Sequence, residues 1–221
     1  MKLVYVFSKK GRLRFVSHLD LQRFLMRALN RTCLPIAFSQ GFNPHPLLSI
    51  AGALAMGYES DYEVFEVKID KEIDLQTALA TMQAALPEEL FIKEVQTRPD
   101  NYPSLTSLVT MADYEIKPQK EAEILCKAAE TFRQMTSCMG IRKSKSGEKE
   151  VDVRALCLNI ETHDFLINAR LMLTEKDTLK PDLLIKTLSG IAGIAMPDCR
   201  VCRKALLGTD KSGKVRLITE L

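Results

Sequence analysis

The chain has 221 residues, of which 46% are hydrophobic and 27% are charged. This is the composition of a globular protein with enough apolar material for a core, arranged as one large domain or two small ones. No apolar run approaches the roughly 18–20 residues that a membrane-crossing helix needs, and the start of the chain turns basic too early for a secretory signal. We therefore expect a cytoplasmic protein without a membrane partner.

The formal net charge of +3 is unevenly distributed along the chain. Residues 1–35 carry eight basic side chains and one acidic one, Asp20, so this segment has a charge of +7 and the rest of the chain sums to −4. A local basic patch on a nearly neutral protein indicates an anionic partner. A solvated basic face without a partner would give the same pattern.

The first half of the chain reads as strand, helix, strand, strand, helix, strand. Residues 2–8 are rich in β-branched and aromatic side chains and predict a strand. Apolar positions spaced for a helix follow from Ser17. The remaining elements are strands at 36–38 and 47–54 around a loop, a strand at 62–69, a helix marked by Leu75, Leu79, Met82 and Leu86, and a strand at 90–96.

The second half repeats this pattern after a proline-containing linker at 97–106. Strands are expected within 107–117 and at 151–160, 165–173 and 199–207, helices at 119–136 and 181–191, and an exposed loop at 142–150. The order βαββαβ is the ferredoxin-like arrangement. We therefore predict an α+β chain of two tandem ferredoxin-like halves with antiparallel sheets, residues 1–98 and 105–208, and a tail or short added strand at 209–221.

The start of the first helix, Ser17-His18-Leu19-Asp20, is the first candidate site. Ser17 and Asp20 have the spacing of a capping box, and an acid suits the positive end of a helix. Capping does not require His18, which can act as a general acid or base or contact phosphate. A hydrogen-bonded structural histidine is the alternative.

Basic side chains on both sides of this helix start form the second candidate. Arginines four residues apart share one helix face, and alternating basic residues share one side of an extended segment. Guanidinium groups suit phosphate oxygens, although acids from elsewhere in the fold would neutralise them. The predicted anion-binding or RNA-binding residues are Lys10, Arg12, Arg14, Arg23, Arg27 and Arg31.

The third candidate is the loop Ser39 to Pro46. Gly41 permits unusual backbone angles, and two prolines stiffen the segment that follows. Such a loop would display Gln40, Asn43 and His45 in fixed directions and would allow Phe42 to stack on a base. A turn with a buried Phe42 is the alternative. Since a second strand that includes the loop residues would run back along the first helix, we expect His45 to approach His18 and Asp20.

Cysteine chemistry is a weaker candidate. Cys199 and Cys202 form a CxxC motif, which is half of a zinc site or a redox pair, but no second pair has a matching spacing. The chain also lacks a CxxxCxxC motif, a P-loop, a GxGxxG fingerprint and a GxSxG elbow. We predict no metal ion and no cofactor.

Three strings are more specific than these patterns: FSKKGRLRFVSHLDLQRFLMRAL, LPIAFSQGFNPHP and GALAMGYES, together with the later VDVRAL. They resemble the radical-SAM-linked proteins, a largely uncharacterised bacterial family found beside or fused to the C-terminus of a radical-SAM enzyme. Ser17, His18 and Asp20, residues 40–46, and Asp152 with Arg154 match its signatures, whereas Leu47 and Ala155 depart from them. The resemblance implies a radical-SAM enzyme as partner and assigns no catalytic residue.

Two functions from different classes remain open. The first is a non-catalytic partner of a radical-SAM enzyme that binds RNA or presents substrate through its basic surface. The second is a metal-independent, RNA-processing enzyme that uses His18 or His45 as the general acid or base, with Asp20 beside it. The second rests on analogy of fold alone.

Overall fold

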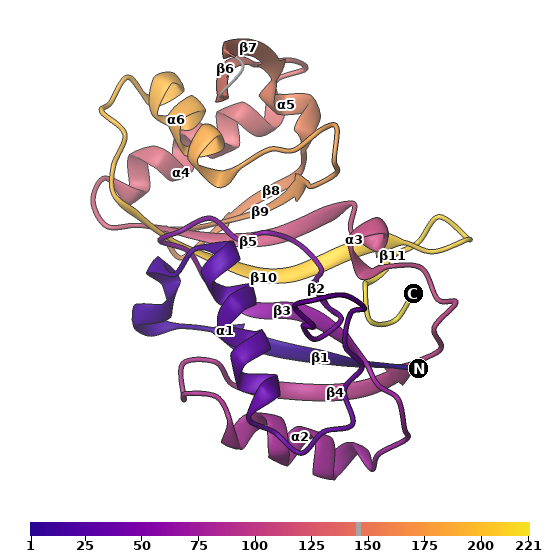
Figure 1. Cartoon of the computed structure of the whole chain (residues 1–221). Helices are drawn as coiled ribbons and strands as arrows, with labels where there is room; N and C mark the ends of the chain where they lie inside the picture. Colours follow the sequence, from indigo (N-terminus) through magenta and orange to yellow (C-terminus); the bar gives the residue numbers. More distant parts are fainter. Residues whose placement is uncertain (145–146) are drawn as a thin grey trace. The chain divides into compact units, whose positions relative to one another are not determined.

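The computed structural model of the chain describes residues 1–144 and 147–221 (Figure 1). It divides into two compact units, Met1–Val109 with Gly208–Leu221 and Thr110–Leu207. The described residues contain six α-helices and antiparallel strands, so the mixed α and β character is confirmed. None of these helices has the length and apolar character that crossing a membrane demands.

The sheet of the first unit contains β1 (Lys2–Lys9), β2 (Leu48–Ile50), β3 (Glu59–Lys68) and β4 (Ile92–Arg98). Strand β1 lies between β4 and β3. Strand β2 pairs with the other edge of β3, because Val67 lies opposite both Leu3 of β1 and Leu48 of β2. Around these strands lie the short 3-10 helix η1 (Gly11–Phe15), α1 (His18–Asn30), α2 (Leu75–Ala84), α3 (Leu105–Leu108) and β11 (Val215–Leu217), which pairs with β10 (Cys199–Thr209).

The core of the first unit forms between its strands and the apolar face of α1. Leu3 to Lys9 of β1 are all buried, and the ring of Tyr5 stacks on Phe65 with centroids 4.8 Å apart. Leu21, Leu25 and Leu29 face this core from α1 at the spacing of a helix. Burial of these side chains is the main stabilising contribution to this unit.

The C-terminal residues fold back onto the first unit. The Tyr62 and Thr219 hydroxyl oxygens lie 2.6 Å apart, and the Arg98 guanidinium donates to the Ile218 carbonyl over 2.9 Å. Residues 209–221 therefore contain a short strand and belong to the packing of the first unit.

The second unit contains β5 (Met111–Pro118), α4 (Ala122–Gln134), β8 (Cys157–His163), β9 (Leu166–Met172), α6 (Pro181–Ala192) and most of β10. Its strand order is β10-β5-β9-β8, with antiparallel neighbours. The hairpin of β6 (Met139–Ser144) and β7 (Gly147–Asp152) forms a separate two-stranded sheet, and the short helix α5 (Val153–Leu156) follows it.

Three local expectations are wrong. Residues 36–38 form no strand but make isolated bridges, Ile36 to Ile69 and Phe38 to Pro46. The segment 142–150, expected as a loop, contributes to the β6–β7 hairpin, apart from residues 145 and 146, which lie outside the described residues. The segment 151–160 begins with the end of β7 and α5 before β8 starts at Cys157. In the last two cases, backbone pairing and capping override a polar or β-branched sequence pattern.

Candidate ligand-binding surface of the first unit

Ser17 caps helix α1. Its Oγ accepts a hydrogen bond from the Asp20 backbone N–H over 3.2 Å and donates to the Asp20 carboxylate over 2.7 Å. Arg23 approaches the same carboxylate at 3.3 Å. The hydrogen bond from Ser17 is the main reason that the pKa of Asp20 is held below its ordinary value. Ser17 and Asp20 thus form the cap that their spacing predicts. The Asp20 carboxylate is bound by Ser17 and Arg23.

Acidic residues of β3 and its start neutralise much of the basic N-terminal segment. The Lys10 ammonium lies 2.7 Å from the carboxylate of Asp61, and Arg14 lies 3.8 Å from Glu59. The Arg31 guanidinium instead donates to the Ala85 carbonyl over 3.0 Å. The sequence had left two alternatives for these basic residues, an anionic ligand or acids of the same chain. For Lys10 and Arg14 the structure shows acids of the same chain.

Arg12 and Arg27 differ from the other predicted anion-binding residues. Both are exposed. Within the part of the chain that the structure describes, neither side chain donates a hydrogen bond or forms a salt bridge. Arg27 still acts on Asp20 through space, since its charge helps to lower the pKa of that carboxyl group. These two guanidinium groups are therefore available to an anionic ligand without the loss of an internal contact.

The loop from Ser39 to His45 is closed by its own hydrogen bonds. The Ser39 backbone N–H donates to the His45 carbonyl over 2.9 Å, and the Ser39 Oγ accepts from the His45 backbone N–H over 3.1 Å and lies 2.9 Å from the His45 Nδ1. Gly41 has a φ of +126°, in the region that favours glycine. These bonds hold residues 40–44 as an exposed tip.

Phe42 stands at this tip with its side chain fully exposed, at 106% relative accessibility. The alternative of a buried Phe42 is therefore not what the structure shows. Gln40 and Asn43 on either side are exposed as well. The tip presents an aromatic ring and two amides on a loop whose ends are joined by hydrogen bonds.

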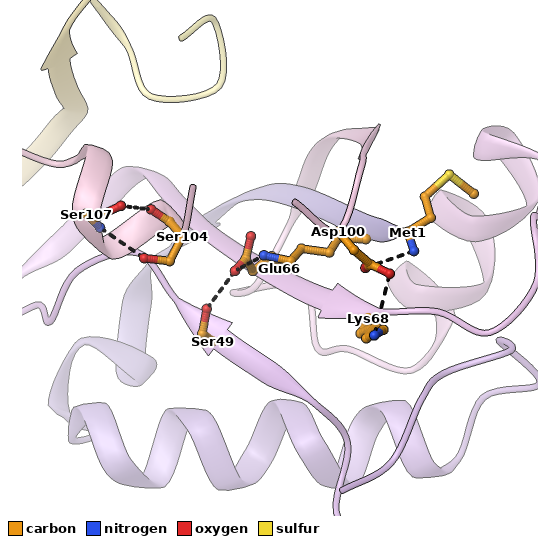
Figure 2. Close-up of polar contacts among 8 residues, drawn as sticks. Met1, Ser49, Glu66, Lys68, Asp100, Ser104 and Ser107 are labelled. Carbon is orange, nitrogen blue, oxygen red and sulfur yellow. Dashed lines mark hydrogen bonds and ion pairs between the residues drawn. The ribbon is translucent and has the colours of Figure 1, made fainter. Parts of the chain in front are cut away.

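Behind the tip, His45 lines a pocket of about 280 Å³ together with Gln22 and Met26 of α1. Its other lining residues come from β1, β2 and β3 and from the end of the loop. There the carboxylate of Glu66 accepts from the Lys2 ammonium over 3.0 Å. It also accepts from the Ser49 hydroxyl over 3.3 Å, and Figure 2 shows this second contact.

Figure 2 also shows a second polar group beside this wall. Asp100 binds the amino group of Met1 at 2.9 Å and the Lys68 ammonium at 3.5 Å. Both groups fix the start of β1 and the end of β3, which carry Lys2 and Lys68 into the pocket wall.

The structure brings only some of the predicted site residues together. Gln22 and Met26, which line one pocket with His45, follow His18 by one and two turns, about 6 and 12 Å along the helix axis. His45 thus shares its pocket with the middle of α1, and His18 is not among the lining residues. The start of the loop is joined to the sheet at Lys68, whose carbonyl accepts a hydrogen bond from the Ala37 backbone N–H. Lys68 lies opposite Lys2, at the start of β1. Residues 10–14 follow the other end of β1, roughly 25 Å away at 3.3 Å per residue. They do not converge on the loop.

The sequence of the chain matches one protein family over most of its length. A family model described as "Uncharacterized protein conserved in bacteria (DUF2344)" matches residues 2–181. The chain belongs to this family. The match includes the capped start of α1, the closed loop and the segment around Asp152, and it carries no link to radical-SAM enzymes. No curated protein matches the chain.

The string VDVRAL, residues 151–156, has a local structural role. The carboxylate of Asp152 accepts hydrogen bonds from the backbone N–H groups of Cys138 and Arg154, each over 3.0 Å. Arg154 donates to the Cys157 carbonyl over 2.8 Å and to the Arg133 carbonyl over 3.3 Å. Both side chains thus fix the junction of the hairpin, α5 and the end of α4.

The CxxC motif lies on strand β10. Side chains three positions apart on a strand point to opposite faces of the sheet, and Cys199 and Cys202 pair with different positions of β5, Pro118 and Glu115. Burial raises the pKa of the Cys199 thiol to about 11. The strand geometry opposes joint ligation of one metal ion by the two thiols.

Sequence reasoning missed the residues of the pocket behind the loop: Lys2, Gln22, Ser49, Glu66 and Lys68. Of these residues, only Glu66 could have been singled out from the sequence. It is a charged residue between Phe65 and Val67, and side chains alternate along a strand, so it lies on the other face of the sheet from these two apolar residues. The pairing of Ser49 with Glu66 across β2 and β3 could not be read from the sequence.

Proposed function

We propose that the first unit binds single-stranded RNA and acts as a non-catalytic binding protein. The observation that supports this most is the fully exposed Phe42 at the tip of a loop closed by Ser39 and His45. Stacking of a base on an aromatic side chain contributes about 1–3 kcal/mol, and it tolerates any base sequence. Because the loop is held by its own hydrogen bonds, it loses less conformational entropy when it binds a ligand.

The charges of this unit favour an anionic strand but limit the number of phosphate contacts. Arg12 and Arg27 are exposed and accessible, whereas Lys10 and Arg14 already have carboxylate partners. Exposed ion pairs are worth little and exchange readily, so the Arg23–Asp20 pair does not prevent Arg23 from contacting a phosphate. We expect a few phosphate contacts and moderate affinity.

The test is a titration of the full chain with a fluorescent single-stranded RNA at increasing salt. For single strands the log–log slope is roughly −0.7 per phosphate contact, so we expect a shallow negative slope. Arg27→Glu should weaken binding, and Arg133→Glu, an equal change on α4 of the second unit, should not. Equal affinity of Arg27→Glu and the unchanged chain would remove α1 from the interface.

The same samples separate binding from catalysis. If the chain were an endonuclease using His18 or His45, the RNA would be shortened without any partner, and the loss of cleavage in His45→Ala would mark the acid or base. Intact RNA after prolonged incubation is the result that the binding proposal expects.

A radical-SAM enzyme as partner is supported by the sequence resemblance, and co-purification of such an enzyme with the tagged chain is its test.

We also infer that both units are ferredoxin-like. This inference is supported by the strand orders, which are β4-β1-β3-β2 and β10-β5-β9-β8 with antiparallel neighbours. In each unit a helix follows the first and the third of these four strands in chain order, as in the ferredoxin-like arrangement.

A further inference from the structure

A separate pocket lies in the second unit, between the β6–β7 hairpin and helix α6. Its volume is about 440 Å³, within the range of about 300–1,000 Å³ that is usual for small-molecule sites. Eight described residues line it: Ile141, Arg142, Thr178, Lys180, Asp182, Leu183, Lys186 and Met196. None of them belongs to the first unit.

A close approach of β6 to its neighbours forms one side of this pocket. A Cβ at Gly140 would lie 2.7 Å from the Val153 side chain and 3.5 Å from Leu183. The absence of a side chain at position 140 therefore lets the strand lie against α5 and α6. The adjacent Ile141 then belongs to the pocket wall.

The apolar part of the pocket is exposed to solvent. Ile141 and Met196 have 45% and 48% of their surface accessible, and Leu183 is half-buried. A ligand that covered these side chains would gain free energy in proportion to the apolar area that it removes from water. This wall therefore fits an apolar ligand body.

The polar part of the pocket is predominantly cationic, with three basic residues and one acid, Asp182. The Arg142 guanidinium donates to the Thr178 carbonyl over 3.3 Å, which orients it toward this side of the hairpin. Lys180 precedes α6, and Lys186 lies one turn after Asp182. Both lysines are exposed and form no salt bridge with any residue that the structure describes.

We propose that this pocket binds a small amphiphilic anion, with a carboxylate or phosphate head between Arg142, Lys180 and Lys186 and an aliphatic body against Ile141, Leu183 and Met196. Charge complementarity selects the anionic head, and the exposed apolar wall selects the body. The proposal uses only residues of the second unit and does not depend on RNA binding.

The test is isothermal titration calorimetry of the full chain with decanoate and decyl phosphate, both below their micelle concentrations. We expect one molecule bound per chain for at least one of them, and the tighter of the two identifies the preferred head group. Decyltrimethylammonium, which has the same chain and the opposite charge, should bind at least about ten-fold more weakly. Acetate, which has the head without the body, should give no measurable heat.

Single variants then assign the site. Lys186→Ala should weaken binding of the better anion by about ten-fold, and Lys120→Ala, an equal change just before α4, should leave it unchanged. Circular dichroism on each variant shows that the fold is kept. Failure of both anions to bind, equal binding of the cationic amphiphile, or unchanged affinity in Lys186→Ala and Arg142→Ala alike would overturn the proposal.

Discussion

Ser39 and His45 hold the tip of the loop in the first unit: the Ser39 Oγ lies 2.9 Å from the His45 Nδ1, and the Ser39 N–H donates to the His45 carbonyl over 2.9 Å. The two residues are six positions apart, and between them lie Gly41 and the exposed Phe42. The loop is thus a closed unit that displays one aromatic ring.

This pair should behave as one energetic unit. Each of Ser39→Ala and His45→Ala should lower the free energy of unfolding by about 0.5–1.5 kcal/mol, because each removes the hydrogen bond between the two side chains. Ser39→Ala should have the larger effect, because it also removes the acceptor of the His45 backbone N–H. The double variant should lose little more than Ser39→Ala alone, with a coupling energy of about 0.5 kcal/mol or more. Urea denaturation of the four proteins measures this. Simple additivity would show that the contact is not formed in solution.

Two glycines should respond in opposite directions to the same change. A Cβ at Gly208 would overlap with the Leu108 carbonyl oxygen, so Gly208→Ala should lower the free energy of unfolding by about 1–3 kcal/mol. A Cβ at Gly190 of α6 would meet nothing, so Gly190→Ala should raise it by about 0.5–1 kcal/mol. Thermal denaturation compares them. A stable Gly208→Ala protein would contradict the packing of α3 against the C-terminal segment.

Asp152 should make the second unit sensitive to acid. Its pKa lies below the ordinary value of 3.8, chiefly because its carboxylate accepts from the Cys138 backbone N–H. A depressed pKa means that the carboxylate stabilises the fold above about pH 4 and that this contribution disappears as the pH falls below it. Asp152→Ala should therefore lower the melting temperature at pH 7, and the difference should shrink toward pH 3.

Asp198→Ala is the control for that experiment, since it removes an acid just before β10 and no cap. It should follow the unchanged chain across the same pH range. If the Asp152→Ala difference stayed constant from pH 7 to pH 3, the proposed role of the ionised carboxylate would be wrong.

The six cysteines should differ widely in reactivity. Cys33 is exposed, whereas Cys157 is buried and its pKa is raised to about 12 by loss of solvation. Since the thiolate is the reactive form, an aromatic disulfide reagent at pH 8 should modify Cys33 first and Cys157 only after unfolding. Loss of the fast phase in Cys33→Ser checks the assignment. A fast phase that persisted would place an accessible thiol elsewhere.

The strands and helices of both units follow from local patterns, but their exceptions have identifiable causes. Ser17 predicts the start of α1 because a cap is a local interaction, and the structure forms it. The sequence of 142–150 has no alternating apolar pattern, so the pairing of residues 142–144 with 147–149 in the β6–β7 hairpin could not be predicted. Whether Lys10 and Arg14 are available to a ligand depends on Asp61 and Glu59, which lie 51 and 45 positions further along the chain. A local sequence pattern does not predict such distant partners.

The proposed role of Phe42 is the central claim, and one pair of variants tests it most directly. Fluorescence anisotropy with a single-stranded RNA should show binding by the unchanged chain at low salt and an affinity about ten-fold lower or more for Phe42→Ala, because one stacked base is lost. Phe91→Ala removes another exposed ring, at 55% accessibility, and should bind like the unchanged chain. Equal affinity of Phe42→Ala and Phe91→Ala, or no binding by the unchanged chain at low salt, would contradict the account.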